Sequence, residues 1–294
     1  MNTYSASKGP WNFRQIAARV WFEVGDDRAM LVAAGVTYYI LLALVPSMAV
    51  IVSIYGLFTD VATVNSQVNL LVGILPPGGV EIIGEQLKRL TAASQTQLSL
   101  TLLVSLLVAF WSAGAGVRAL IDAMNIAYDV TDSRPFVRLN LIAVAFTFGM
   151  LLTAVALVAV LVVMPTALHF LALGKGFDWL IRVVAYGLIL LLLLVGLDVL
   201  YRWGPYREQH RYRWFTPGAI LAVIGITVVS VAFSWYAANF STYNATYGSL
   251  GALVGFLTWI WLSVTIIIVG AELNAELEHH RRAMLLGGLD PNSS

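Results

Sequence analysis

Six stretches of the chain are each apolar over at least about 20 residues, the length that a helix needs to cross a hydrocarbon core. They lie at roughly 29–58, 98–121, 139–165, 178–203, 217–240 and 248–271, and most charged residues fall between them. Of the 294 residues, 59% are hydrophobic and 11% charged, far from the usual composition of a soluble domain. The sequence predicts an all-α integral membrane protein with a bundle of six transmembrane helices.

The distribution of lysine and arginine predicts the orientation in the membrane. The segments before, between and after these spans alternate between two sides, and one side holds most of the basic residues. These are Lys8, Arg14, Arg19, Arg28, Arg134, Arg138, Arg202, Arg207, Arg211, Arg213, Arg281 and Arg282. The other side holds Lys88, Arg89, Lys175 and Arg182. Basic loops stay in the cytoplasm, so we expect a multi-pass protein of the bacterial inner membrane with both termini cytoplasmic and no cleavable signal peptide.

Three parts of the chain are predicted. Residues 1–28 form an amphipathic cytoplasmic segment, which either lies in the membrane interface or packs on the bundle's own cytoplasmic face. Residues 29–277 form the membrane domain, with a helical extracytoplasmic insertion at 59–97. This insertion could lie on the membrane, cover a pore or form a dimer contact. Residues 278–294 form a cytoplasmic tail.

Proline and glycine mark candidate hinge or close-packing positions in the spans. A proline inside a helix removes one hydrogen bond and bends it, while glycines four residues apart let helices approach closely. A packing role is the favoured interpretation of the proline. The candidates are Pro46, Gly114, Gly116, Gly251 and Gly255.

A polar stripe marks the end of the second predicted span, in the segment WSAGAGVRALIDAMNIAYD. Arg118, Asp122, Asn125 and Asp129 are spaced i, i+4, i+7 and i+11, which places them on one helical face. Two further pairs four residues apart lie at the same predicted depth, Asp198 with Arg202 and Glu272 with Glu276. The sequence therefore predicts a polar vestibule or charge cluster at the inner leaflet.

Two interpretations of this stripe stand side by side. In the first, Arg118 extends to the membrane surface or pairs with Asp122, Asp198 or Glu272 and ties the helix ends together. In the second, the arginine lines a path for a solute or lipid headgroup, because a charge inside a membrane is retained only at a cost. Physical reasoning alone favours the structural tie.

Catalytic and nucleic-acid functions are poorly supported by the sequence. The chain has no cysteine, and its four histidines do not have metal-ligand spacing. We predict no catalytic residue, no metal and no cofactor. The segment YRWGPYREQHRYRW interleaves arginine with aromatic residues as a nucleic-acid surface does, but a cytoplasmic loop between two spans has the same composition, and this second interpretation is favoured.

Several segments together resemble the YihY/virulence factor BrkB family of bacterial inner-membrane proteins. They are AAGVTYYILLALVPSMAVIVSIYGLF, WSAGAGVRALIDAMNIAYD, LYRWGPYREQHRYRWFTPGAILAVIG, FSWYAANFSTYNATYGSLGALVGFLTWIW and GAELNAELE. The resemblance implies six transmembrane helices but no settled activity. The family once carried a ribonuclease label that is regarded as misassigned, and the lack of metal-ligand spacing in this sequence agrees with rejecting it. Members of the family have been linked to serum resistance and to export of lipid-like material. The recurring positions retained here are Arg118, Asp122, Asn125, Tyr128, Pro205, Pro217, Gly218, Tyr243, Tyr247, Gly248, Gly270, Glu272 and Asn274.

These observations favour a non-enzymatic transporter or translocator of lipids or other amphiphiles, with an inward-facing polar cavity. An anionic headgroup would pair with Arg118, while acyl chains meet the apolar outer half of the bundle. The path candidates are Arg118, Asp122, Asn125, Asp198, Arg202, Glu272 and Glu276. The alternative is a structural or regulatory envelope protein whose charges are internal ties. Expected partners are membrane lipids, an anionic amphiphile and further copies of the chain, but no nucleic acid.

Overall fold

The computed structural model describes residues 13–58, 95–170, 178–207, 214–239 and 249–287, and every regular element in these ranges is an α-helix. The helices are α1 (Phe13–Asp26), α2 (Ala29–Phe58), α5 (Gln95–Ala127), α6 (Phe136–Phe170), α7 (Asp178–Trp203), α8 (Pro217–Asn239) and α10 (Ser249–Gly287). Nearly all of the insertion predicted at 59–97 lies outside the described residues; its last three residues begin α5.

Each predicted span lies on one of the long helices, and α2 and α7 have the predicted bounds. By length and apolar composition, four described segments could cross a membrane, or five if the bent pair of α1 and α2 counts as one span. Within α6 the described apolar segment is shorter, Phe136–Met150. The helical membrane architecture is confirmed, and six as the number of spans stays a prediction.

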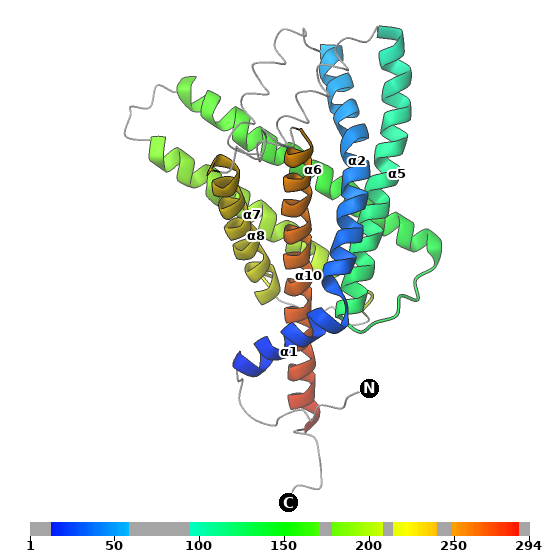
Figure 1. Cartoon of the computed structure of the whole chain (residues 1–294), viewed down its shortest axis with the longest axis vertical. Coiled ribbons are helices and arrows are strands. Elements are labelled where there is room, and N and C mark those ends of the chain that lie inside the picture. The colour runs from blue at the N-terminus through cyan, green and yellow to red at the C-terminus, as the bar shows by residue number, and fades with distance from the viewer. Residues whose placement is uncertain (1–12, 59–94, 171–177, 208–213, 240–248, 288–294) are drawn as a thin grey trace, which may run out of the picture.

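The long helices contact one another in a closed order around the bundle (Figure 1). Going around it, α2 packs on α5, α5 on α6, α6 on α7, α7 on α8, α8 on α10, and α10 returns to α2. The last helix also touches α5 and α1, so it has the most central position. With 39 residues, α10 is about 58 Å long at 1.5 Å per residue, and it continues past the other helices on the side of the termini, as Figure 1 shows. The predicted tail from 278 is therefore helical as far as Gly287.

Buried side chains gather at one end of the bundle, where α2 and α8 begin and where α5 and α7 end beside α10. We call this the converging end. Its fully buried side chains include Val36, Met124 and Tyr201. Toward the other end the helices spread apart in Figure 1, and large apolar side chains such as Leu107, Val228 and Val254 are exposed. An apolar exposed surface of this kind suits contact with lipid.

Helix α1 packs across the projecting part of α10 and meets α2 at a bend of 60°. Its side chains Ile16 and Val20 are buried, whereas Trp21 and Phe22 on the other side are exposed. Arg28, at the bend, has a left-handed backbone with φ of 51°. Of the two predicted positions for the amphipathic segment, the structure agrees with packing on the bundle.

The predicted hinge positions have different surroundings. Pro46 lies within α2, which continues unbroken past it. A Cβ at Gly116 would lie 3.3 Å from the Cβ of Tyr39, and one at Gly255 would lie 3.1 Å from Cζ of Phe233. Gly114 has open space around its Cα, and Gly251 is half-buried. The tightest helix contact lies at two other glycines, Gly218 of α8 and Gly270 of α10.

A Cβ at Gly218 would overlap the carbonyl oxygen of Gly270, and a Cβ at Gly270 would overlap the hydroxyl of Tyr201. Beside this contact, the Gly218 N–H donates to Asn274 Oδ1 at 2.8 Å, and the Tyr201 hydroxyl donates to the carbonyl of Ile267 at 2.7 Å. Hydrogen bonds therefore join α7 and α8 to α10 beside these close contacts.

Candidate functional site

Arg118 does not pair with the acids that the sequence suggested. Its Nη1 donates to Oδ1 of Asn140 on α6 at 2.6 Å, and the side chain is half-buried. Asp122, one turn further along α5, is exposed. Among the described residues, Arg118 forms no ion pair with Asp122, Asp198 or Glu272. The expectation of an ionic tie is therefore wrong in its partner, and Arg118 joins α5 to α6 through a neutral amide.

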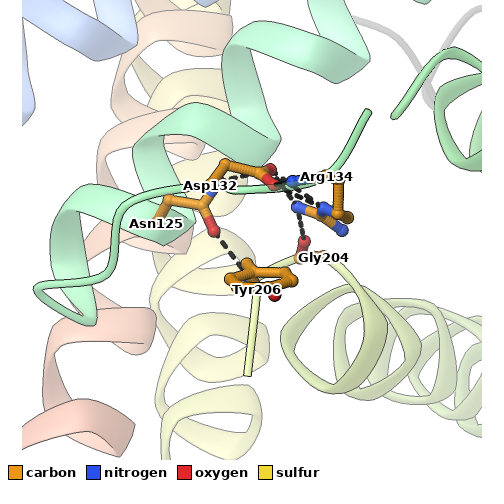
Figure 2. Close-up of polar contacts among 5 residues, drawn as sticks. All are labelled: Asn125, Asp132, Arg134, Gly204 and Tyr206. Atoms are coloured by element: carbon orange, nitrogen blue, oxygen red, sulfur yellow. Dashed lines mark hydrogen bonds and ion pairs between the residues drawn. The ribbon is translucent and has the colours of Figure 1, made fainter. Parts of the chain in front are cut away.

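Asn125 belongs to a network that joins the loops after α5 and α7 (Figure 2). Its Oδ1 accepts from the backbone N–H of Tyr206 at 2.7 Å, and its Nδ2 donates to Asp132 at 3.1 Å. Arg134 donates to both carboxylate oxygens of Asp132 and, at 3.0 Å, to the carbonyl of Gly204. The sequence analysis counted Arg134 only for orientation and missed this role.

The Asp132–Arg134 pair is largely shielded from solvent. The side chains are 15% and 4% exposed, respectively. Hydrogen bonds from Arg134 hold the pKa of the Asp132 carboxyl below its usual range. The Arg134 guanidinium also lies 5.7 Å from the ring centre of Tyr206. These contacts fix the loop geometry, and the short spacing of Asp132 and Arg134 is the only sequence signal for them.

Asp198, near the end of α7, supports the start of α8. Its carboxylate accepts from the Thr216 N–H at 3.0 Å, from Thr216 Oγ1 at 2.8 Å and from the Phe215 N–H. The first backbone N–H groups of a helix have no partner within the helix, and a negative charge near them is favourable. Asp198, which the sequence placed on the path, therefore directs these three contacts to the residues at the start of α8.

Arg202 lies beside two aromatic rings at the end of α7. Its guanidinium carbon is 5.6 Å from the ring centre of Trp203 and 5.4 Å from that of Trp214. The rings are close to perpendicular, at 82°. The Nε of Arg202 is buried and has no hydrogen-bond partner among the described residues. Both tryptophans are about half exposed, so the site reaches the protein surface.

Arg207 belongs to the loop after α7, and its side chain lies in the same region as Arg202. It donates to Glu278 of α10 at 2.9 Å and to the carbonyl of Tyr201 at 2.5 Å, and its guanidinium lies 4.2 Å from the ring centre of Tyr128. Burial raises the pKa of the Tyr128 phenol above its usual range. A cavity of about 10 Å³, the size of one water molecule, is lined by Tyr128, Asp198, Tyr201, Arg202, Arg207, Trp214 and Thr216.

Glu272 and Glu276, one turn apart on α10, have opposite environments. Glu276 accepts a hydrogen bond and ion pair from Arg19 of α1 at 2.8 Å. Glu272 is only 3% exposed, and its Oε1 has no hydrogen-bond partner among the described residues. The carboxyl of Asp27, at the bend between α1 and α2, hydrogen-bonds with Glu272. Burial raises the pKa of Asp27, and this hydrogen bond acts in the opposite direction.

Among the described residues, two of the seven predicted path residues line the small cavity, and the path itself stays a prediction. Asp198 and Arg202 share the small cavity, whereas Arg118, Asn125 and Glu276 bond to other elements. The sequence analysis did not place several participating residues in a site, among them Asp27, Asp132, Arg134, Asn140, Arg207, Glu278 and Arg19.

Long apolar helices that meet at one polar end define a helical membrane protein. The sequence matches the family described as Virulence factor BrkB over residues 20–289, and the chain belongs to this family. The family assignment agrees with the resemblance found in the sequence.

Three curated relatives illustrate the similarity. A ribonuclease-like protein of Bacillus subtilis, YfkH, is 34% identical over 61% of this chain and 66% of its own length. The UPF0761 membrane protein NMC0462 of Neisseria meningitidis is 28% identical over 94% of this chain and 67% of its own length. The UPF0761 membrane protein XAC0937 of Xanthomonas axonopodis is 28% identical over 89% and 61%, respectively. The chain therefore spans about two thirds or less of these relatives. No solved structure matches.

Proposed function

We propose that the chain is a non-enzymatic translocator of an anionic amphiphile in the bacterial inner membrane, with Arg202 as the headgroup contact. The supporting observation is the buried Nε of Arg202, a donor without a hydrogen-bond acceptor among the described residues. A buried donor costs free energy unless it is hydrogen-bonded, and a phosphate or carboxylate oxygen would satisfy it. Arg202 replaces Arg118 in this role, because Asn140 already accepts from Arg118.

The surroundings of Arg202 suit a lipid headgroup. Trp203 and Trp214 are half exposed beside it, and tryptophan is enriched where membrane and water meet. Arg207 also lines the cavity, with its charge paired to Glu278. Because the cavity has the size of one water molecule, entry of a headgroup requires the tryptophans or the end of α7 to move. Acyl chains would stay on the exposed apolar surface of the spreading helices.

Translocation of a fluorescent anionic lipid in proteoliposomes tests this proposal. We expect movement with the wild type and with Arg138→Gln, and a loss of at least tenfold with Arg202→Gln. Arg138 is a matched control because it is an exposed arginine predicted to lie on the same side of the membrane. Each variant must give the same size-exclusion profile. Movement that is equal in Arg202→Gln and wild type would contradict the assignment of Arg202.

A second candidate function is a structural envelope protein without transport. Two ion pairs favour it, because each joins segments that are far apart in the chain: Arg19 with Glu276, and Arg207 with Glu278. A third pair, Arg134 with Asp132, lies within the loop after α5. This candidate predicts no lipid movement in the wild type and a loss of stability when the pairs are broken. The proteoliposome measurement therefore separates the two functions. Self-association of the chain stays a prediction under both.

A further inference from the structure

The carboxyl of Glu272 lies in an acidic environment that the proposed lipid site does not use. Asp27 from the bend after α1, Glu23 from α1 and Asp129 from the end of α5 all act on it electrostatically. Glu272 is 3% exposed, and within the part of the chain that the structure describes one of its oxygens has no hydrogen-bond partner. Burying an ionised carboxylate without compensation costs several kcal/mol or more, so this environment requires a compensating positive charge or a proton.

Two arginines of this region, Arg19 and Arg207, already form ion pairs with other acids. Arg19 pairs with Glu276, one turn further along α10, and Arg207 pairs with Glu278. Arg28, next to Asp27, is exposed. Among the described residues, neither Asp27 nor Glu272 belongs to any of the three ion pairs.

The other helices that pack on α10 offer no compensating charge. Neither α2 nor α8 contains Asp, Glu, His, Lys or Arg. From the end of α5 come Asp129 and the neutral phenol of Tyr128. Helix α1 contributes Glu23 and Arg19, and Arg19 is paired with Glu276. The negative charge of Asp26 acts on Asp27. Of the described groups that act on Glu272, those not already paired are therefore negative or neutral.

A hydrogen bond between two carboxyl groups requires a proton on one of them. Two carboxylates in direct contact repel each other, and one of the pair then stays protonated well above the usual range. A metal ion is a weaker explanation, because in the ranges that the structure describes no three His, Asp or Glu side chains are grouped as metal ligands. A single contact between two carboxyl groups is therefore best explained by a shared proton.

We propose that Asp27 and Glu272 form a proton-binding site that holds the bend between α1 and α2 against α10. The bound proton joins the two carboxyls, and its loss leaves two negative charges in contact, one buried at Glu272 and one half-buried at Asp27, that push the bend away from α10. Glu23 and Asp129 add to this repulsion. The site is separate from Arg202, and it does not depend on whether the chain moves lipids.

Infrared spectroscopy of the full chain in nanodiscs tests the bound proton. We expect the C=O band of a protonated carboxyl in the wild type at pH 7, shifted in D₂O and lost at alkaline pH. Glu272→Gln should remove the band, and Glu276→Gln, one turn away, should keep it. Because Glu272→Gln could fail to fold, Asp27→Asn serves as a second variant that should remove or shift the band. A wild type without the band at pH 7 overturns the proposal, as does a band that both variants leave unchanged.

Addition of NaCl at constant pH distinguishes a proton from a sodium ion. The proposal predicts that the carboxyl band is insensitive to Na⁺ when K⁺ is used as the reference salt. A band that Na⁺ removes and K⁺ does not would overturn the proposal in favour of a sodium site.

The predicted movement is measured by spin-label distances, for which the chain is suited because it has no cysteine. Labels at Ala18→Cys of α1 and His279→Cys of α10 should show a longer or broader distance distribution as the pH rises. The same pair in a Glu272→Gln background should not change with pH. Labels at Leu42→Cys of α2 and Leu107→Cys of α5 serve as the control pair. A pH response that is equal with and without Glu272 would contradict the proposed movement.

Discussion

Arg19 of α1 and Glu276 of α10 form an ion pair at 2.8 Å, although 257 positions separate them in the chain. The pair lies beside the buried side chains Ile16 and Val20, so it holds the amphipathic helix in one place on α10. The arginine side chain is 37% exposed and the glutamate side chain 11% exposed. Solvent therefore screens the pair in part, and its contribution to stability is modest.

We expect Arg19→Gln to lower the free energy of unfolding by about 1 kcal/mol, in the upper part of the range for partly exposed pairs. A double-mutant cycle with Glu276→Gln isolates the interaction, because the second substitution should cost less once the first is present. Thermal melting of the purified protein in detergent measures all four species. Strict additivity of the two losses would show that the pair contributes no coupling energy.

Gly218→Ala is expected to be strongly destabilising. The added methyl group would overlap the carbonyl oxygen of Gly270 and the side chain of Asn274. Overpacking of this kind costs about 1–3 kcal/mol, and separation of the helices would also break the bond from the Gly218 N–H to Asn274. Thermal melting followed by size-exclusion chromatography provides the measurement.

Gly187→Ala on α7 is the matched control for this substitution. Gly187 is also within a helix, but apart from its own helix backbone and chain neighbours no described atom lies within 4 Å of the position of its added Cβ. Alanine is the better helix former by about 1 kcal/mol, so this variant should be as stable as the wild type or slightly more stable. Equal losses in Gly187→Ala and Gly218→Ala would refute the close contact of α8 and α10.

The lowered pKa of the Asp132 carboxyl predicts a loss of stability in acid. Its pKa is low in the folded state because Arg134 donates hydrogen bonds to it, whereas in the unfolded chain it returns to about 3.9. The folded state then binds fewer protons, so the contribution is present above the unfolded value and is lost as the pH falls through the folded value. Melting temperatures measured from neutral pH downward should fall less steeply in Asp132→Asn than in the wild type.

Arg134→Gln should produce the same flattening of the acid profile, because it removes the donors that lower the pKa of Asp132. The double variant should add nothing further to the flattening. If Asp132→Asn retained the full acid dependence of the wild type, the stabilising role of the Asp132–Arg134 pair would be disproved.

Much of the helical architecture could be predicted because the length of an apolar stretch is a local property. The bounds of α2 and α7 followed directly from it. Helical spacing also indicated that polar residues meet at one end, where Asn125, Asp198 and Glu272 are indeed buried. These predictions required only the positions of residues along their own helices.

The partners of these side chains could not be predicted in the same way. Helical spacing places Glu272 and Glu276 near one face, but it does not indicate that Arg19 reaches only the second of them. That choice depends on the 60° bend between α1 and α2, which also brings Asp27 to Glu272. Likewise, Arg118 meets Asn140 only because α6 packs on α5. Such contacts depend on helix packing, for which the sequence has no local signal.

Substitutions of Asp198 test whether this residue has a structural role or lies on a substrate path. Asp198→Ala would leave the N–H groups of Phe215 and Thr216 without an acceptor at the start of α8, where a lost cap costs about 1 kcal/mol. Asp198→Asn keeps one carbonyl oxygen as an acceptor and should lose less. We therefore expect melting temperatures in the order wild type, Asp198→Asn, Asp198→Ala. Lipid movement by folded Asp198→Asn in proteoliposomes should match the wild type, because in this structure Asp198 bonds to the chain's own backbone. Normal stability combined with lost movement would instead place Asp198 beside Arg202 on the path.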